Sequence, residues 1–227
     1  MDAIQLVKKD HRTVEGLFKA FERAARAEKA AEMRRLVREM TRELSVHAVI
    51  EEAILYPSLR RAAESAEDQV LEALEEHHLV KLTLAELEGM TRGDERYEAK
   101  VSVLVENVRH HVKEEEQELL PRLRKAFSPK DLRDLGDLMA QAKRAAPTRP
   151  HPSAPDTPPG NLVAGALAAI LDRGRDMLRD AAEKGRRAMR SRARAATRRA
   201  KARGGKASQR TRATAAYLSG QDQPSVH

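Results

Sequence analysis

Apolar side chains recur every three or four residues through the first part of the chain. They form runs such as Val14, Phe18 and Phe21. This spacing places side chains on one face of an α-helix. The runs predict four helices, near residues 2–27, 29–63, 67–91 and 94–126. Short connections make neighbouring helices antiparallel, so the predicted fold is all-α, an up-down-up-down four-helix bundle.

A shorter fifth helix is predicted to pack on this bundle. It would begin at Ser128, a suitable N-cap, followed by Pro129, which fits the first position of a helix. With this helix, the bundle forms a predicted first domain that covers residues 1–146.

The pattern changes beyond residue 146, where three further segments are predicted. Residues 147–161 form a Pro-rich linker, because six of the fourteen residues that begin with Pro147 are prolines. Residues 162–183 carry apolar side chains on one side, which predicts a small amphipathic helix. Residues 184–227 are rich in Lys and Arg and have little to form a core, which predicts a disordered basic tail.

Composition agrees with a helical protein and excludes several kinds of chemistry. Aromatic residues make up only 3% of the chain, which favours an aliphatic core. There is no cysteine, so disulfides, thiolate metal ligands and cysteine nucleophiles are excluded. The amino terminus lacks a hydrophobic signal core, and the longest apolar run is about half of the ~20 residues of a membrane span. We therefore expect a cytoplasmic protein without a transmembrane segment.

The net charge is divided unevenly between the two parts of the chain. Residues 1–146 contain 26 Lys and Arg against 29 Asp and Glu, whereas residues 147–227 contain 17 against 6. A basic tail attracts DNA, RNA or an anionic lipid surface without reading a sequence. The residues that would make such contacts are Arg186, Arg187, Arg190, Arg192, Arg194, Arg198, Arg199, Lys201 and Arg203. The alternative is a solubilising extension with no fixed partner.

One arrangement of chemical groups occurs twice in the first domain. The stretch "HAVIEEAILYP" places Glu51 four residues after His47, and "HVKEEEQELLP" places Glu115 four residues after His111. Each histidine is followed ten residues later by a proline. A further histidine precedes each pair, His11 by 36 residues and His77 by 34. The bundle therefore resembles one helical hairpin used twice.

This repeat predicts a metal site inside the bundle. Residues four apart share a helix face, so each histidine and glutamate pair can point at one centre. Ionisable groups inside an apolar bundle are costly unless they are paired or bind a metal. The candidate ligands are His11, His47, Glu51, His77, His111 and Glu115. If both glutamates bridge two ions, positions remain for an oxo or hydroxo bridge and exchangeable ligands. Imidazole and carboxylate suit iron or manganese, and zinc also fits.

Four stretches of the chain resemble the motif blocks of the hemerythrin-like, HHE cation-binding family. They are "DHRTVEGLF", "HAVIEEAILYP", "EEHHLVK" and "HHVKEEEQELLP". The resemblance covers residues 1–146 and implies a non-haem di-iron site with carboxylate bridges, held by the six residues named above. A metal-free structural bundle is the competing interpretation of the same residues.

One position departs from the family's oxygen carriers. These have a second histidine four residues after the ligand on the third helix, and this chain has Lys81 there. The resemblance therefore favours ferroxidase, peroxide or nitric-oxide chemistry, or iron sensing, over reversible oxygen transport. Glu15, four residues after His11, could add a ligand or act as an acid beside the ligands, and Glu52 could orient a histidine.

The expected function is binding of oxygen or of reactive oxygen or nitrogen species, or the handling of iron, in a stress response. The basic tail would tether this chemistry to nucleic acid. The alternative is an interaction protein that senses iron or oxygen, or sequesters iron, without catalytic turnover. The sequence leaves open whether the protein is an enzyme of the peroxide or ferroxidase type, which metal it holds in the cell, and its oligomeric state.

Overall fold

A computed structural model describes residues 1–91 and 93–153, and this part of the chain is helical with no β-strand. The α-helices are α1 (Ala3–Arg26), α2 (Ala30–Ile50), α3 (Tyr56–Ala62), α4 (Glu67–Glu88), α5 (Tyr97–Glu114), α6 (Leu120–Ala126) and α7 (Pro129–Ala145). Two π-helical turns, η1 (Glu51–Leu55) and η3 (Glu115–Leu119), join α2 to α3 and α5 to α6, and a 3₁₀ turn, η2 (Glu64–Ala66), precedes α4.

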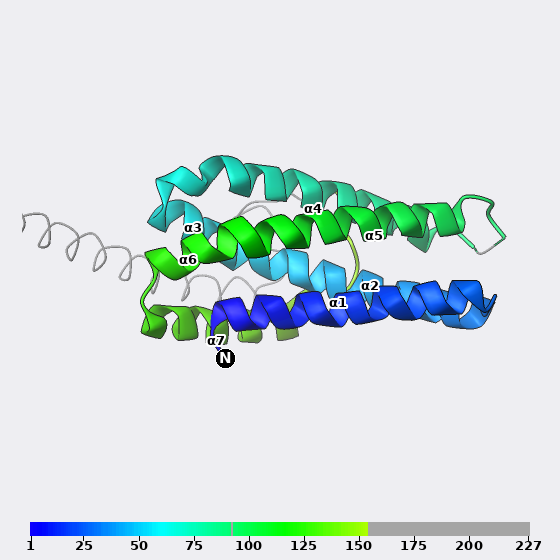
Figure 1. Ribbon diagram of the computed structural model, residues 1–227, viewed down its shortest axis with the longest axis horizontal. Helices are drawn as coiled ribbons and strands as arrows, with labels where there is room; N and C mark the ends of the chain where they lie inside the picture. The colour runs from blue at the N-terminus through cyan, green and yellow to red at the C-terminus, as the bar shows by residue number, and fades with distance from the viewer. Residues whose placement is uncertain (92, 154–227) are drawn as a thin grey trace, which may run out of the picture. The chain divides into compact units, whose positions relative to one another are not determined.

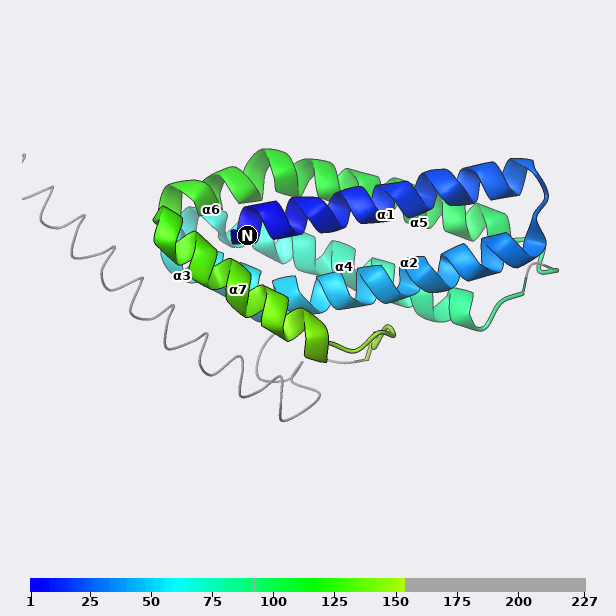
Figure 2. The same cartoon turned by 90° about the horizontal axis from the view of Figure 1, so that it is seen from below.

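The helices form two antiparallel hairpins that lie against each other (Figures 1 and 2). Helix α1 packs on α2, α4 packs on α5, and the hairpins meet through α2 with α4 and α1 with α5. Each π-helical turn continues its helix. Helices α2 and α3 therefore form one long helix, and α5 and α6 form another. The predicted all-α, up-down-up-down bundle with a short fifth helix is confirmed.

The first and last helices of this part begin with side-chain caps. The Asp2 carboxylate accepts a hydrogen bond from the Gln5 backbone N–H at 2.8 Å, and the Gln5 side chain in turn accepts from the Asp2 N–H. Ser128 caps α7 in the same way, with Asp131 as its partner and Pro129 as the first helical residue. Each pair satisfies backbone donors that a helix leaves free at its start. The predicted start of the fifth helix is therefore confirmed.

Helix α7 lies against α1 and α2 at the end of the bundle that carries the amino terminus (Figure 2). Gly136 permits this close approach. A Cβ atom at this position would lie 2.7 Å from the Ala3 backbone nitrogen and would also meet the Met1 carbonyl. A glycine is needed here because of the neighbouring backbone and not because of an unusual φ.

The π-helical turns occupy equivalent places in the two hairpins, and each ends two residues before a proline. The Tyr56 N–H donates to the Glu51 carbonyl, and the Leu120 N–H donates to the Glu115 carbonyl. Pro57 and the equivalent Pro121 cannot donate, and in an α-helix each ring would clash with the carbonyl four residues earlier. A wider turn relieves this conflict, and π-helical turns are frequent at functional sites.

The apolar core has two parts with a polar layer between them. One part fills the end of the bundle near α3, α6 and α7, where Tyr56 and Leu55 are among its largest buried side chains. The other fills the end that carries the α1–α2 and α4–α5 connections, around Phe18 and Leu84. The layer between the two parts contains the buried histidines and glutamates.

Several predicted segments lie outside the described residues. They are the remainder of the Pro-rich linker beyond residue 153, the amphipathic helix 162–183 and the basic tail 184–227, with the nine candidate nucleic-acid contacts between Arg186 and Arg203. Within the described part, no helix combines the length and the apolar character that crossing a membrane would require.

Candidate metal centre

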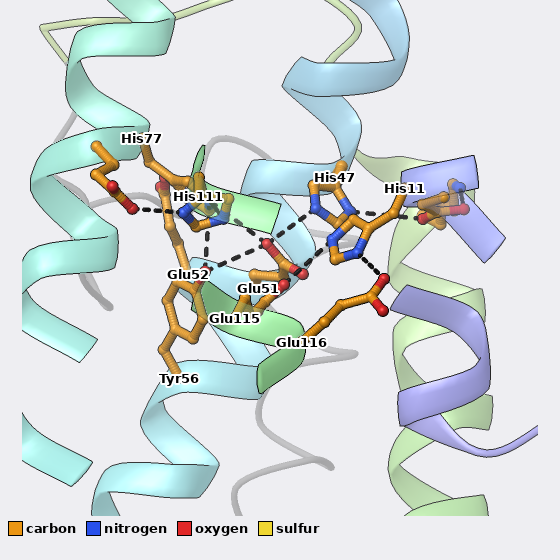
Figure 3. A network of polar contacts seen from close by, with 12 residues as sticks. His11, His47, Glu51, Glu52, Tyr56, His77, His111, Glu115 and Glu116 are labelled. Carbon is orange, nitrogen blue, oxygen red and sulfur yellow. Dashed lines mark hydrogen bonds and ion pairs between the residues drawn. The ribbon is translucent and has the colours of Figure 1, made fainter. Parts of the chain in front are cut away.

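The structure brings all six predicted ligands together in the polar layer of the bundle. His11 comes from α1, His47 from α2, His77 from α4 and His111 from α5, while Glu51 and Glu115 are the first residues of the two π-helical turns. Each of the six side chains is buried. In Figure 3, the two carboxylates lie between the histidine pair of the first hairpin and the histidine pair of the second.

The ligand atoms form two groups that share one carboxylate. His11, His47, Glu51 and Glu115 place one atom each within 4.8 Å of one another, and Glu51, His77 and His111 do the same. Glu51 Oε2 lies 3.2 Å from His47 Nε2 and 3.4 Å from His77 Nε2, so it faces both hairpins. His11 Nε2 lies 3.2 Å from Glu115 Oε2. This arrangement offers imidazole and carboxylate ligands to two neighbouring cations.

Several of these atoms have no hydrogen-bond partner within residues 1–91 and 93–153. They include Nε2 of His11 and His47, Oε1 of Glu51 and both carboxylate oxygens of Glu115. Buried polar atoms are almost always satisfied, so a cluster of unsatisfied ones requires an explanation. A cation bound among them supplies it, because each atom has a lone pair that a metal ion can accept. The donor set, nitrogen and oxygen without sulfur, fits iron, manganese or zinc.

The second nitrogen of each imidazole faces a carboxylate outside the ligand set. His11 Nδ1 lies 2.9 Å from Glu116 Oε1, and His77 Nδ1 lies 3.0 Å from Glu52 Oε1. A carboxylate only accepts, so Nδ1 carries the proton and Nε2 keeps its lone pair for a metal. The prediction that Glu52 orients a histidine agrees with this geometry.

In the other two histidines, Nδ1 faces an acid that immediately precedes a candidate ligand in the sequence. His111 Nδ1 lies 2.7 Å from Glu76 Oε2, and His47 Nδ1 lies 3.7 Å from Asp10 Oδ2, beyond hydrogen-bond distance. The orienting acids therefore follow the internal repeat, as the ligands do. Glu52 and Glu116 are equivalent, and so are Asp10 and Glu76.

Lysines neutralise three of the four orienting acids. The buried Lys81 ammonium lies 3.0 Å from Glu52 Oε1, and Lys8 lies 2.9 Å from Glu116 Oε2. Lys143 reaches from α7 to Asp10 at 2.5 Å. Lys81 thus contacts the carboxylate behind His77, at the position where oxygen carriers have a further imidazole ligand.

Tyr56 distinguishes the two halves of the centre. Its hydroxyl lies 3.4 Å from Glu51 Oε2 and 3.4 Å from His77 Nε2, and the side chain is 1% exposed. In an α-helix, residues five apart point about 140° away from each other, and the wider π turn reduces this angle. The equivalent residue of the second hairpin is Leu120, which brings no oxygen. Burial raises the pKa of Tyr56 well above its usual value, so its hydroxyl keeps its proton.

Burial keeps two of the imidazoles neutral in the metal-free chain. It lowers the pKa of His47 to about 4, against an ordinary value of 6.5. Burial also lowers the pKa of His77 well below 6.5, helped by the neighbouring charge of His111. Burial opposes protonation of His11 too, but Glu115 and Glu116 outweigh it and raise the pKa of this imidazole. Neutral imidazoles are the form that binds metal.

The two ligand carboxylates titrate as a pair in the absence of metal. Burial and the charge of Glu115 raise the pKa of Glu51 well above its usual value. Burial also acts on Glu115, but His11 and the other imidazoles outweigh it and lower its pKa to about 2. Protonation therefore falls on Glu51, the carboxylate that both ligand groups share. Binding of a cation would displace this proton.

A small cavity of about 20 Å³ adjoins the histidines on the side of the core that contains Phe18. It is lined by His11, His47, His77 and His111 together with the apolar side chains Val14, Leu44, Ala48, Val80, Val108 and Val112. The Nε2 atoms of His77 and His111 are 3.2 Å apart at this place. The cavity offers a small molecule a mainly apolar space next to the candidate ligands.

One predicted site residue lies apart from this cluster. The Glu15 carboxylate pairs with Arg109 at 2.9 Å and with Lys19 at 3.4 Å, and it belongs to neither ligand group. Arg109 holds the pKa of Glu15 below its usual value, so this side chain acts in a surface ion pair. The expectation of a ligand or a neighbouring acid at Glu15 is corrected here, because Arg109 of α5 draws the carboxylate outward.

Sequence reasoning did not single out Asp10, Tyr56, Glu76 or Glu116. The internal repeat marks the three acids, Asp10, Glu76 and Glu116, because equivalent acids occur in both hairpins. An acid directly precedes His11 and His77, and a second glutamate directly follows both Glu51 and Glu115.

Known proteins support the same assignment. The family description "Hemerythrin HHE cation binding domain" matches residues 2–123. An uncharacterized hemerythrin-like protein of Schizosaccharomyces pombe is 34% identical over 137 residues, which is 60% of this chain and 68% of that protein. The crystal structure of a hemerythrin HHE cation binding domain-containing protein from Mycobacterium kansasii has a TM-score of 0.56 and 25% identity, and the match covers 64% of this chain and 86% of that one.

The family match spans more than half of the chain and includes all six candidate ligand residues. The fold, the buried clusters of histidine and glutamate and the similarity to both relatives agree with it. The chain belongs to the hemerythrin HHE cation-binding domain family.

Proposed function

We propose that the bundle holds two iron ions in a non-haem centre that binds oxygen, peroxide or nitric oxide. The observation that carries this proposal is the pair of ligand groups that share Glu51. His11, His47 and Glu115 would hold one ion, His77 and His111 would hold the other, and Glu51 would contact both. Such a centre supplies redox chemistry and open coordination positions when the metal is bound.

The residues around the centre have separate tasks in this proposal. Glu116, Glu52 and Glu76 orient three imidazoles through Nδ1, and Asp10 faces the fourth. Tyr56 keeps a proton on its oxygen 3.4 Å from Glu51 and can donate a hydrogen bond to an anionic ligand atom. The apolar side chains that line the 20 Å³ cavity exclude water from the histidine side of the centre.

Reactive-species chemistry is favoured over reversible oxygen transport by the second hairpin. It supplies two imidazoles, His77 and His111, and Lys81 pairs with Glu52 instead of supplying a third. Fewer protein ligands leave more positions for peroxide, nitric oxide or oxygen. We place this activity in a stress response, in the cytoplasm, with turnover of peroxide or oxidation of ferrous iron as the reactions to test.

The basic tail would hold this chemistry near nucleic acid. The support is charge alone, since residues 147–227 carry 17 Lys and Arg against 6 Asp and Glu. Contacts of this kind need only phosphate and depend strongly on salt.

Metal analysis of the full chain, purified without added metal, tests the proposal. We expect two iron atoms per chain, near-ultraviolet absorption from the loaded centre and consumption of added peroxide. A His47→Ala variant should lose metal and peroxide consumption, whereas a His151→Ala variant, altered at an exposed histidine, should keep both. A parent chain that holds less than one metal ion, or two of another element, would contradict the di-iron proposal.

The alternative function is iron or oxygen sensing, or iron sequestration, without turnover. The contact between Lys143 and Asp10 favours it, because it links the residues behind His47 to α7, the last helix before the linker. Peroxide consumption that is equally fast in the parent and in His47→Ala, while only the parent binds iron, would support this alternative.

A further inference from the structure

A second cavity leads from the protein surface to the candidate centre. It measures about 50 Å³, and its walls include the exposed Glu72 and Glu118 as well as the buried His111 and Glu115. Glutamates dominate its lining, and among the described residues that line it there is no Lys or Arg. At neutral pH this passage therefore favours cations over anions.

A third group of metal-ligating side chains lies beside this passage. Glu76, His110 and Glu114 each place one ligand atom within 4.8 Å of the others. His110 Nε2 is 3.3 Å from Glu114 Oε1 and 3.8 Å from Glu76 Oε1. Both glutamates also line the cavity. Unlike the two inner groups, this one is open to solvent, since the His110 side chain is 61% exposed.

The inner end of the same cavity reaches the candidate centre. There Glu115 is 1% exposed, and within the described part of the chain its carboxylate oxygens have no hydrogen-bond partner, although Oε2 lies 3.2 Å from His11 Nε2. Glu76 connects the two levels, because its other oxygen, Oε2, accepts a hydrogen bond from His111 Nδ1 at 2.7 Å. The Glu76 carboxylate would thus contact a cation at the surface group through one oxygen and His111, a candidate ligand of the inner centre, through the other.

The two hairpins differ at this position in a way that favours one side. Asp10, the equivalent of Glu76, is covered by α7 and neutralised by Lys143. Glu76 has His110 instead of a lysine as its second partner. The acid-lined cavity lies on the side of the second hairpin, between α4, α5 and η3. Among the described residues, Lys143 closes this position in the first hairpin, whereas carboxylates line it in the second.

We propose that Glu76, His110 and Glu114 form an outer site for a divalent cation, and that the glutamate-lined cavity passes the cation inward to His111 and Glu115. This inference rests on the proposed metal centre and adds the route by which it is loaded. Attraction by the carboxylates raises the local concentration of cations and so speeds loading. Exchange of oxygen and imidazole ligands moves the ion inward, and no redox step is involved.

Stopped-flow loading of the metal-free full chain with Co²⁺ tests the route. Visible absorption reports when imidazole and carboxylate replace water around the ion, independently of any activity. The test variant is Glu114→Gln with His110→Asn, which leaves Glu76 to orient His111. A matched control, Glu106→Gln with His151→Asn, makes the same two changes at exposed positions outside the cavity. A second test variant, Glu72→Gln with Glu118→Gln, alters two exposed residues of the cavity wall.

We expect both test variants to load at least about fivefold more slowly than the control at low ionic strength. They should reach the same final amount of Co²⁺ in the inner centre, because the six candidate ligands there are intact. Added salt should slow the parent more than the variants. Loading of both test variants at the control rate would overturn the proposed route while leaving the centre in place. Failure of the parent itself to bind Co²⁺ would instead contradict the proposed centre.

Discussion

Lys81 and Glu52 form a buried ion pair behind His77, and this pair makes the position sensitive to substitution. The two charged groups are 3.0 Å apart, and both residues are less than 10% exposed. Removing one partner of a buried pair leaves the other charge without compensation, which typically costs 3–5 kcal/mol. At the scale of single residues, the orienting groups around the imidazoles should therefore affect stability as well as metal binding.

We predict that Lys81→Met lowers the free energy of unfolding of the metal-free chain by about 3 kcal/mol. Adding Glu52→Gln should restore part of this loss, since the amide removes the uncompensated charge and its oxygen can still accept from His77 Nδ1. Urea denaturation of the parent, the single variant and the double variant measures both effects. Equal stability of the parent and Lys81→Met would show that this ion pair contributes little.

The sequence predicts six candidate ligands that the structure brings together, but it does not predict the part played by most of the acids behind them. The ligands stand out because a histidine and a glutamate four residues apart share a helix face, and the pattern occurs twice. Asp10, Glu76 and Glu116 are sequence neighbours of ligands and point about 100° away from them on their own helices. They serve imidazoles of adjacent helices instead, so their role depends on packing that one helix does not reveal.

At the scale of elements, the bundle and its fifth helix follow from apolar spacing, N-cap residues and short connections. The π-helical turns do not. A π-helical turn is rare, and Pro57 and Pro121 by themselves indicate only a local break. The sequence therefore does not predict that Tyr56 faces Glu51, because this contact depends on the wide turn.

The contact between α7 and α1 gives a prediction with an internal control. Gly136→Ala should destabilise the protein by about 1–3 kcal/mol, because the new methyl group would overlap the backbone at Met1 and Ala3. Gly16→Ala, in the middle of α1 with no atom within 4 Å of the added Cβ, should stabilise it by roughly 0.5–1 kcal/mol. Thermal denaturation of the two variants should shift in opposite directions. A Gly136→Ala variant as stable as Gly16→Ala would show that α7 is loosely attached.

At the scale of the whole molecule, the chain joins an acidic bundle to a basic C-terminal part. The difference in charge suggests that the two parts can be tested separately. A chain that ends at Ser153 keeps every described residue and all six ligands, and it loses the 13 Lys and Arg found between Lys184 and Arg212.

We predict that this shortened chain binds as much metal as the full chain and loses salt-dependent binding to duplex DNA. Fluorescence anisotropy with a labelled duplex at several salt concentrations measures the second effect. The slope of the affinity against salt concentration should be steep for the full chain, because each phosphate contact releases a counterion. Equal DNA affinity of the two chains would rule out tethering by the tail.

The Lys143 contact also bears on where the functional unit ends. The family match stops at residue 123, and all six candidate ligands precede that point. The ammonium group that compensates Asp10, the acid nearest His47 Nδ1, is supplied from beyond it, by α7. A fragment trimmed to the matched region would keep every coordinating atom and leave that buried acid without its counter-ion. The minimal unit for studying this centre therefore has to extend through α7.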